Sequence, residues 1–343
     1  MQTARVFAPG TIANVGSGFD CLGLCLDGIG DEVTVGPSPS GHDEVFVTGR
    51  DASRVPLDPR LNCAAVAAAA ARTALGREET FRIQIERALP LSGGLGASAA
   101  ASVGGALAAA YAFGARPRLS EILDWALAGE EAVAGRHLDN IAPCLLGGMT
   151  LSFFAAASPE AGRPIVRAFD VVALGSRRPL WMAVITPRLR IETRAARALL
   201  PESVGRATYA EGLARASAVV AAFLTADHEL LGAGLEDPFA VPARKGLIPG
   251  FDRAREVALS AGALGFSISG SGPTLFAPCQ TVDAASDVAE RVVEVFREVG
   301  ASSLVCQIAG LRSQNLNANL GEPNSAGSGV LRGATCVSLT ASS

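Results

Sequence analysis

Residues 90–102 read PLSGGLGASAAAS, a glycine-rich stretch that separates a segment of alternating apolar residues from a long run of alanine. Its glycines, at positions 93, 94 and 96, let the backbone approach a ligand without a Cβ in the way. The helix expected from about Ala97 to Phe113 points its free N–H groups and the positive end of its dipole at this loop. That geometry suits phosphate groups, although a tight strand-to-helix turn would use the same glycines.

Composition limits the classes of protein to which the chain can belong. It has 343 residues, of which 49% are hydrophobic and 18% charged, so it can bury a substantial core in one large or two moderate domains. A net charge of −4 gives no support to a nucleic-acid-binding surface. Of the 29 basic residues, 28 are arginine and only Lys245 is lysine. The chain has no Walker A sequence with its phosphate-binding lysine, and a protein kinase, which needs a lysine on an early strand, is disfavoured.

Cysteine usage and hydropathy favour a reducing, cytoplasmic setting. The seven cysteines are scattered, without a C-x-x-C pair or a histidine at zinc spacing, and we expect them to be small buried or half-buried thiols. The N-terminus does not read as a signal sequence. The uncharged stretch Leu89–Ala115 is long enough to cross a bilayer, but it consists mostly of Ala, Gly and Ser, which favours a buried helix.

The hydrophobic pattern predicts strands and helices in mixed order. Strands are expected at residues 5–7, 33–35, 81–85, 150–155, 180–185, 265–269 and 274–277. Helices are expected at residues 61–75, 97–113, 193–200, 209–224, 251–261 and 283–299, with another that Ser120 caps and that runs towards Val133. We place a domain boundary in the Pro- and Gly-containing segment 156–164. The Asn-, Gly- and Ser-rich residues 314–333 lack periodicity and predict a mobile tail.

Three further motifs accompany the glycine loop. Residues 8–26 read APGTIANVGSGFDCLGLCL, residues 129–149 read GEEAVAGRHLDNIAPCLLGGM, and residues 265–276 read GFSISGSGPTLF. From about Arg5 to Ile308 the chain resembles the GHMP kinases. Their motifs are an N-terminal A-P-x-x-x-N-x-G-x-x-x-D segment, a central P-x-x-x-G-L-G-S-S-A loop and a C-terminal G-S-G-P segment. Within that family, the first motif and the central H-x-D-N-x-A-P resemble the branch that phosphorylates homoserine.

The resemblance implies a fold and a reaction. The fold is α+β, with a ribosomal S5 domain 2-like ATP-binding domain at residues 1–157, a ferredoxin-like domain at 158–312, an active site between them and a tail at 313–343. The reaction is transfer of the γ-phosphoryl group of ATP to the hydroxyl of L-homoserine, with Mg²⁺ as cofactor, giving O-phospho-L-homoserine for threonine biosynthesis. Neither nucleic acid nor membrane is expected as a partner, and a homodimer is left open.

The resemblance also assigns residues to the nucleotide and its metal. Ser98 and Glu130 match the magnesium ligands, a hydroxyl and a carboxylate that suit a hard cation. Asn62 and Arg87 stand where the family contacts adenine. The phosphate loop comprises Pro90, Leu91, Ser92, Gly93, Gly94, Leu95, Gly96, Ala97, Ser98, Ala99 and Ala100.

A second group of residues matches the amino-acid site of the family. Arg197 and Arg244 match the pair that holds the substrate carboxylate, for which the guanidinium fork is better suited than an ammonium group. Thr193 and Asn140 are expected near the transferred phosphoryl group. Asp139 is also the candidate general base, unless it only holds the amine. The residues that match the ammonium site are Asn14, Asp20, His137 and Asp139.

Three of these assignments have a simpler alternative. His137 could be a structural histidine, Asp20 a turn residue, and Arg244 with Lys245 a solvated surface pair. The sequence also departs from the family at two points. Ala97 stands where the family has a second serine, and His137 follows Glu130 one residue sooner than the family pattern expects.

Rival functions remain open at this level. One is another GHMP kinase, acting on mevalonate, a shikimate-type alcohol or a sugar, although such substrates lack an ammonium group. Another is a catalytically inactive relative that senses ATP or a metabolite, which loss of Ser98 or Glu130 would have indicated. A serine hydrolase is disfavoured because the chain has no G-x-S-x-G and only three histidines, His42, His137 and His228.

Overall fold

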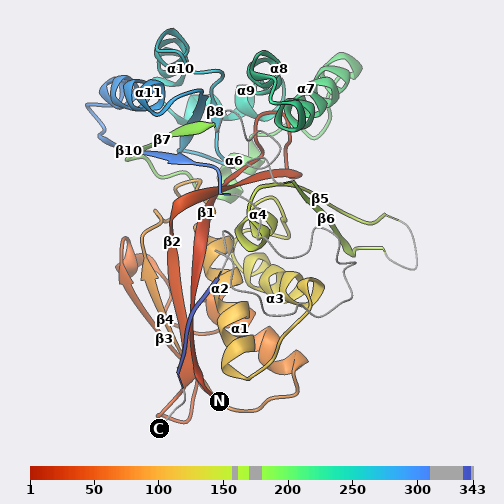
Figure 1. Cartoon of the computed structure of the whole chain (residues 1–343), viewed down its shortest axis with the longest axis vertical. Helices are drawn as coiled ribbons and strands as arrows, with labels where there is room; N and C mark the ends of the chain where they lie inside the picture. The colour runs from red at the N-terminus through yellow and green to blue at the C-terminus, as the bar shows by residue number, and fades with distance from the viewer. Residues whose placement is uncertain (157–160, 170–179, 310–334, 341–343) are drawn as a thin grey trace.

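The computed structural model describes residues 1–156, 161–169, 180–309 and 335–340. Figure 1 shows two layered parts. The larger part carries a long twisted sheet with helices against one face, and the smaller part packs on its end with a second sheet and its own helices. The α+β, two-part architecture expected from the sequence is confirmed.

The larger sheet has seven strands in the order β11-β1-β2-β4-β3, with β5 paired to β2 and β6 paired to β5. All pairs are antiparallel except β3 with β4. The strands are β1 Thr3–Ala13, β2 Leu22–Pro37, β3 Glu44–Gly49, β4 Phe81–Arg87, β5 Met149–Phe154, β6 Pro164–Phe169 and β11 Thr335–Thr340.

Strands β1 and β2 are far longer than the three-residue segments predicted from the sequence. Their glycines and Pro9 look like turn residues, but they lie within the ladder, where the register shifts between Pro9 and Thr11. A Cβ built on Gly30 would meet the carbonyl oxygen of Ala8 at 2.4 Å. Glycine here therefore permits a close approach of two strands, and does not end them.

Four helices cover one face of this sheet, and α2 lies at their centre. They are α1 Cys63–Ala74, α2 Ala97–Ala112, α3 Leu119–Glu131 and α4 Ile141–Leu146, and a short 3₁₀ turn spans Ala52–Arg54. Nearly every residue of α2 is buried, as expected. A Cβ on Gly105 would lie 2.2 Å from the carbonyl oxygen of Ala64, so small residues bring α2 close to α1. Among the described residues, no helix is long and apolar enough to cross a membrane.

The smaller part is ferredoxin-like, as expected. Its antiparallel sheet has the order β10-β7-β9-β8, with helical connections from β7 to β8 and from β9 to β10. The strands are β7 Trp181–Pro187, β8 Ser267–Ile268, β9 Leu275–Cys279 and β10 Ala301–Gln307. The helices are α6 Thr193–Ala198, α7 Arg206–Thr225, α8 His228–Gly234, α9 Ala240–Arg244, α10 Phe251–Ser260 and α11 Val282–Val295, with a 3₁₀ turn at Lys245–Leu247.

Strand pairing corrects two expectations, and a helix cap corrects a third. Strand β6 pairs with β5, so the larger sheet extends to Phe169, beyond the predicted boundary. Residues 335–340 of the expected tail form β11 and pair with β1, while 310–334 lie outside the described residues. Helix α3 begins at Leu119 and not after Ser120, because the Glu121 carboxylate accepts the backbone N–H of Arg118 at 2.6 Å.

The expectation of buried or half-buried cysteines holds for the six whose side chains are described. Four of them are buried and two are half-buried. Burial raises the pKa of each of the two half-buried thiols, Cys21 and Cys63, to about 11. These thiols are therefore protonated and unreactive near neutral pH.

Candidate active site

A single pocket between the two parts brings most of the predicted residues together. Four of them do not reach it: Pro90, Leu95, Ala99 and Ala100 are buried beside it. The predicted residues that line it are Asn14, Asp20, Asn62, Arg87, Leu91, Ser92, Gly93, Gly94, Gly96, Ala97, Ser98, Glu130, His137, Asp139, Asn140, Thr193, Arg197 and Arg244.

The glycine loop closes this pocket at the start of α2. Gly96 precedes the helix with φ +66°, and a Cβ there would lie 2.0 Å from Thr11 Oγ1. Both constraints require glycine. The smaller part fixes the loop, because Ser269 Oγ donates to the carbonyl of Gly94 and the N–H of Thr274 donates to that of Gly93 at 3.1 Å. The loop is thus held with the N-terminus of α2 facing the pocket, as a phosphate site requires.

Serine in place of Ala97 should be tolerated. Ala97 is 7% exposed and lines the pocket at the first position of α2, so an added hydroxyl can reach the pocket. Ala97→Ser should change the KM for ATP by less than about twofold and the melting temperature very little. Ala99→Ser is the contrasting control, because Ala99 is fully buried away from the pocket and a hydroxyl there costs about 1–3 kcal/mol of stability. Loss of ATP binding in Ala97→Ser would show that the loop is packed differently.

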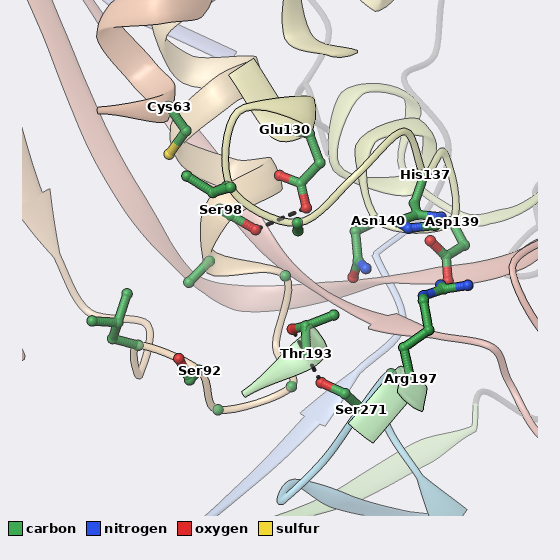
Figure 2. Close-up of a pocket in the computed structure, with 18 of the residues that line it drawn as sticks. Cys63, Ser92, Ser98, Glu130, His137, Asp139, Asn140, Thr193, Arg197 and Ser271 are labelled. Carbon is green, nitrogen blue, oxygen red and sulfur yellow. Dashed lines mark hydrogen bonds between the residues drawn. The ribbon is translucent and has the colours of Figure 1, made fainter. Parts of the chain in front are cut away.

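Ser98 and Glu130 meet at one end of the pocket. Ser98 Oγ donates to Glu130 Oε1 at 2.9 Å, and Figure 2 shows this contact above the loop. The carboxylate is 4% exposed, and its second oxygen, Oε2, is buried with no hydrogen-bond partner. Burial raises the pKa of Glu130 from 4.5 to about 7. A buried, unpartnered carboxylate oxygen beside a hydroxyl fits a divalent cation, which would favour the ionised form.

Magnesium does not need more protein ligands than these. Mg²⁺ usually binds one or two protein groups and takes its other oxygens from water and phosphate. Among the described residues there is no cluster of three or more His, Cys, Asp or Glu side chains that could hold a metal ion. The pair therefore suits a magnesium ion that arrives with a nucleotide, and not a metal held by the protein alone.

Asn140 and Thr193 point into the middle of the pocket (Figure 2). Thr11 Oγ1 donates to Asn140 Oδ1 at 2.7 Å, which turns the amide so that its NH₂ group remains available. Thr193 Oγ1 lies 3.4 Å from Ser271 Oγ. These are hydrogen-bond donors between the two ends of the pocket, where a transferred phosphoryl group would pass.

The other end of the pocket carries an ion pair. Arg197 donates from Nη1 and Nη2 to the two carboxylate oxygens of Asp20, at 2.9 and 2.7 Å, and His137 Nδ1 lies 3.8 Å from Asp20. Burial lowers the pKa of His137, so the imidazole is neutral near pH 7. The sequence assigned Asp20 and Arg197 to opposite ends of a substrate. In the structure, they bind each other.

Asp139 lies beside this ion pair and is almost completely buried. Burial and, to a lesser extent, the Asp20 carboxylate raise its pKa from 3.8 to about 7, against the opposing effects of Arg197 and the backbone N–H of Asn14. A carboxyl group that titrates near neutral pH can hold an ammonium group or accept a proton. Its location supports neither role over the other.

Arg244 is buried and is not a solvated surface residue. It is 3% exposed, and it donates from Nη1 to the carbonyl of Gly270 at 3.0 Å and from Nε to that of Ala196 at 3.3 Å. Lys245 points elsewhere and pairs with Asp252. Asn14 also donates to Gly270, at 3.1 Å. Among the described residues, no carboxylate oxygen lies within 4 Å of an Arg244 nitrogen, so this buried cation is available to an anion.

Asn62 and Arg87 line the pocket, and local contacts occupy the Asn62 amide and part of the Arg87 guanidinium, whose Nε is buried without a hydrogen-bond partner. The Asn62 side chain caps α1 by accepting from the N–H groups of Ala64 and Ala65, and it donates to the carbonyl of Pro56. Arg87 donates to the carbonyl of Leu89 and lies 3.9 Å from Asp31. Their predicted contact with adenine stays a prediction.

The sequence analysis missed several pocket residues. Ser271 was within the quoted G-S-G-P segment and could have been selected from that motif. The apolar residues near Asn62 carry no motif, because only the fold brings their loop to the pocket. The missed residues are Val55, Pro56, Leu61, Cys63, Val133, Ala134, Gly270 and Ser271.

The chain is similar to known proteins along most of its length. Residues 62–148 match the family "GHMP kinases N terminal domain", and residues 219–298 match "GHMP kinases C terminal". The chain is 38% identical to homoserine kinase of Pyrococcus abyssi, over 86% of this chain and 93% of that protein. It is 33% identical to homoserine kinase of Arabidopsis thaliana, over 93% of this chain and 84% of that protein.

Solved structures extend the comparison. A crystal structure of homoserine kinase from Cytophaga hutchinsonii is similar with a TM-score of 0.78 and 34% identity, over 90% of this chain and 95% of that one. Mevalonate kinase of L. major, in complex with R-mevalonate, gives a TM-score of 0.68 at 14% identity, over 89% of this chain and 96% of that one. The second likeness concerns the fold alone.

Proposed function

Since this chain belongs to the GHMP kinase family, we propose that it transfers the γ-phosphoryl group of ATP to the hydroxyl of L-homoserine, a step of threonine biosynthesis. The observation that carries the proposal is the charge pattern of the pocket. A phosphate loop lies at one end, and two arginines with two carboxylates and a histidine lie at the other. Such an end suits a zwitterionic amino acid better than an uncharged alcohol or a sugar.

The nucleotide would bind at the end of the pocket formed by the start of α2. The triphosphate would lie against the loop and the N–H groups of the first helical turn, where the helix dipole favours negative charge. Ser98 and Glu130 would hold Mg²⁺, which supplies charge neutralisation on the phosphates when bound. Because both residues are retained and in contact, the site gives no support to a sensor that has lost its catalytic groups.

The amino-acid end would work by exchange of ion pairs. Asp20 and Arg197 neutralise each other as an ion pair. The substrate ammonium would take the place of Arg197 beside Asp20, and the substrate carboxylate would take the place of Asp20 beside Arg197. A ligand with both charges leaves neither side chain unpaired, whereas a ligand with one charge breaks the pair and satisfies only one half of it. Both side chains are half-buried, so leaving either charge unpaired is unfavourable, and the pocket should select zwitterions.

Transfer itself would depend on position more than on proton chemistry. Phosphoryl transfer passes through a loose transition state in which alignment and charge stabilisation dominate. Asn140 and Thr193 would donate hydrogen bonds near the transferred group. Asp139, with its pKa near 7, would either accept the hydroxyl proton or hold the ammonium group.

A coupled assay of ATP consumption tests the proposal. The purified chain would be offered L-homoserine, 4-aminobutanol, R-mevalonate and galactose at equal concentrations with Mg²⁺. Homoserine should give by far the highest kcat/KM, and mass spectrometry should find O-phospho-L-homoserine. A higher kcat/KM for mevalonate or galactose, or no turnover with any of the four, would overturn the assignment.

A further inference from the structure

Two cations approach each other at the substrate end of the pocket. The guanidinium carbons of Arg197 and Arg244 each lie 5.3 Å from the centroid of the Phe19 ring. Arg197 has Asp20 as a counter-ion, while the Arg244 guanidinium contacts backbone carbonyls. Burial lowers the pKa of Arg244, and the charge of Arg197 lowers it further. The two guanidinium groups therefore repel each other, and the protein must offset that repulsion to keep both in the pocket.

Phe19 lies in the turn between β1 and β2, and its ring is fixed from a second direction. The ring packs edge-on against Phe239, with centroids 5.3 Å apart and an interplanar angle of 84°. In the same turn, Ser17 Oγ donates to the carbonyl of Glu236 at 3.2 Å. The turn of the larger part is thus docked on the segment that leads directly into α9, which carries Arg244.

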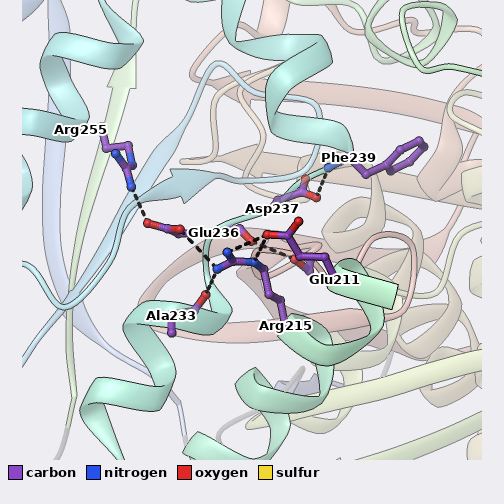
Figure 3. A network of polar contacts seen from close by, with 8 residues as sticks. Glu211, Arg215, Ala233, Glu236, Asp237, Phe239 and Arg255 are labelled. Atoms are coloured by element: carbon purple, nitrogen blue, oxygen red, sulfur yellow. Dashed lines mark hydrogen bonds and ion pairs between the residues drawn. The ribbon is translucent and has the colours of Figure 1, made fainter. Parts of the chain in front are cut away.

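That segment is itself anchored, as Figure 3 shows. The Glu236 carboxylate accepts from Arg255 at 2.6 Å and from Arg215 at 3.3 Å. Asp237 accepts the backbone N–H groups of Phe239, Ala240 and Val241, each at 2.8 Å, and so fixes the first turn of α9. The Phe19 ring therefore rests on a fixed support and can in turn fix the two arginines.

The face of an aromatic ring is chemically suited to holding two guanidinium groups close together. Its negative quadrupole attracts a guanidinium group without adding a full negative charge. A carboxylate in the same place would hold the arginines more strongly, but it would occupy the N–H groups that a substrate carboxylate needs. The ring offsets part of the repulsion and itself takes none of these N–H groups, whose acceptors in this structure are Asp20 and backbone carbonyls. A leucine or methionine side chain fills similar space without the quadrupole.

We propose that Phe19 is a positioning residue that holds the Arg197 and Arg244 guanidinium groups together for a substrate carboxylate. This role rests on the proposed function, since it presumes a carboxylate-bearing substrate. It goes beyond that function because the residue touches the arginines and need not touch the substrate. Phe19 then contributes to specificity for carboxylate-bearing alcohols, and its ring electrons are the property that matters.

Substitution at position 19 tests this role. Phe19→Leu should raise the KM for homoserine about tenfold, while the KM for ATP changes less than twofold and kcat less than threefold. Phe19→Tyr, which keeps the ring, should stay within about threefold of the wild-type KM for homoserine. With 4-aminobutanol, which lacks the carboxylate, Phe19→Leu should change kcat/KM much less than with homoserine. Equal losses for Leu and Tyr, or equal losses for both alcohols, would overturn the proposal.

A matched control is available on β3. Arg82 lies over the ring of Phe46 at 4.9 Å, and Phe46 is 45% exposed and outside the pocket. Phe46→Leu removes an arginine–phenylalanine contact in the same way and should leave both KM values unchanged. If the proposed reaction itself is wrong, the wild-type protein will not turn over homoserine. If only the role of Phe19 is wrong, the wild type is active and the ratios between variants fail.

A second series does not depend on a variant that could fold poorly. Fluorinated phenylalanines placed at position 19 keep the size and shape of the ring and weaken its quadrupole stepwise. The logarithm of the homoserine KM should rise steadily with the number of fluorine atoms, and the KM for ATP should not. A homoserine KM that does not change across the series would exclude the ring electrons and overturn the proposal.

Discussion

A Glu130→Gln variant should lose at least about 100-fold in kcat while it folds normally. The carboxylate of Glu130 is buried beside Ser98, and its free Oε2 faces the place where a cation would neutralise phosphate charge. Glutamine keeps the shape and the Ser98 contact but removes the negative charge. Loss of one group that stabilises charge in a transition state typically costs about 10²- to 10³-fold in kcat. Steady-state kinetics with saturating ATP and homoserine measure this effect.

Glu131 provides the matched control. It is the next residue of α3, exposed to solvent, and outside the pocket. Glu131→Gln should therefore keep wild-type kinetics. Mg²⁺ titration should show weaker binding in the presence of ATP for Glu130→Gln and unchanged binding for Glu131→Gln. A Glu130→Gln enzyme with more than about a tenth of the wild-type kcat would exclude this carboxylate as the metal ligand.

The same substitution should make the metal-free protein less sensitive to high pH. Burial raises the folded-state pKa of Glu130 from 4.5 to about 7. Between these values the folded chain binds a proton that the unfolded chain has released, so the free energy of unfolding falls as pH rises. The fall is complete above about pH 7 and is on the order of 3 kcal/mol. Urea unfolding at pH 5 and pH 8, with a chelator present, should show a smaller fall for Glu130→Gln than for the wild type. An equal fall in the free energy of unfolding for both proteins would contradict the raised pKa of Glu130.

Local sequence signals predicted many of the elements but not β3, β6, β10, β11, α4, α8 or α9, and long-range contacts explain most of the differences. Helix α2 and its glycine loop were predictable because periodicity, composition and the loop glycines agree. The lengths of β1 and β2 were not predictable, because only the position of the opposite strand shows that Gly30 permits a close approach and does not end the strand. Strand β11 could not be found within a low-complexity tail, since its pairing with β1 spans most of the chain.

For the candidate site as well, local motifs predicted which residues take part but not how they contact one another. The motifs identified residues that line one pocket, although they are up to 230 positions apart in the chain, Asn14 and Arg244 for example. They could not show that Asp20 and Arg197 pair with each other across 177 positions. They also gave no sign of Phe19, because a phenylalanine in a turn reads as packing until two arginines are placed over its ring.

Arg244→Leu should lower kcat/KM for homoserine roughly 10- to 150-fold. Its guanidinium is buried and has no carboxylate within 4 Å among the described residues, so a substrate carboxylate would be its counter-ion. A charge-assisted hydrogen bond is worth about 1.5–3 kcal/mol, and each ~1.4 kcal/mol changes a rate tenfold. Arg244→Lys should recover only part of the loss, because an ammonium group cannot reproduce the two-pronged contact. Lys245→Leu, which removes the exposed neighbouring cation, should have little effect.

The decisive test of the carboxylate contact compares two substrates in the Arg244→Leu variant. Arg197 is less suitable for this test. Removing Arg197 would also leave Asp20 without its partner, so effects on the substrate carboxylate could not be separated from effects on its ammonium group. Arg244→Leu should instead reduce turnover of homoserine far more than that of 4-aminobutanol, which never used the arginine, and should leave the KM for ATP nearly unchanged. An equal loss on both alcohols would place Arg244 in the scaffold. A raised KM for ATP would place it on the nucleotide, and in either case the amino-acid assignment would lose its main support.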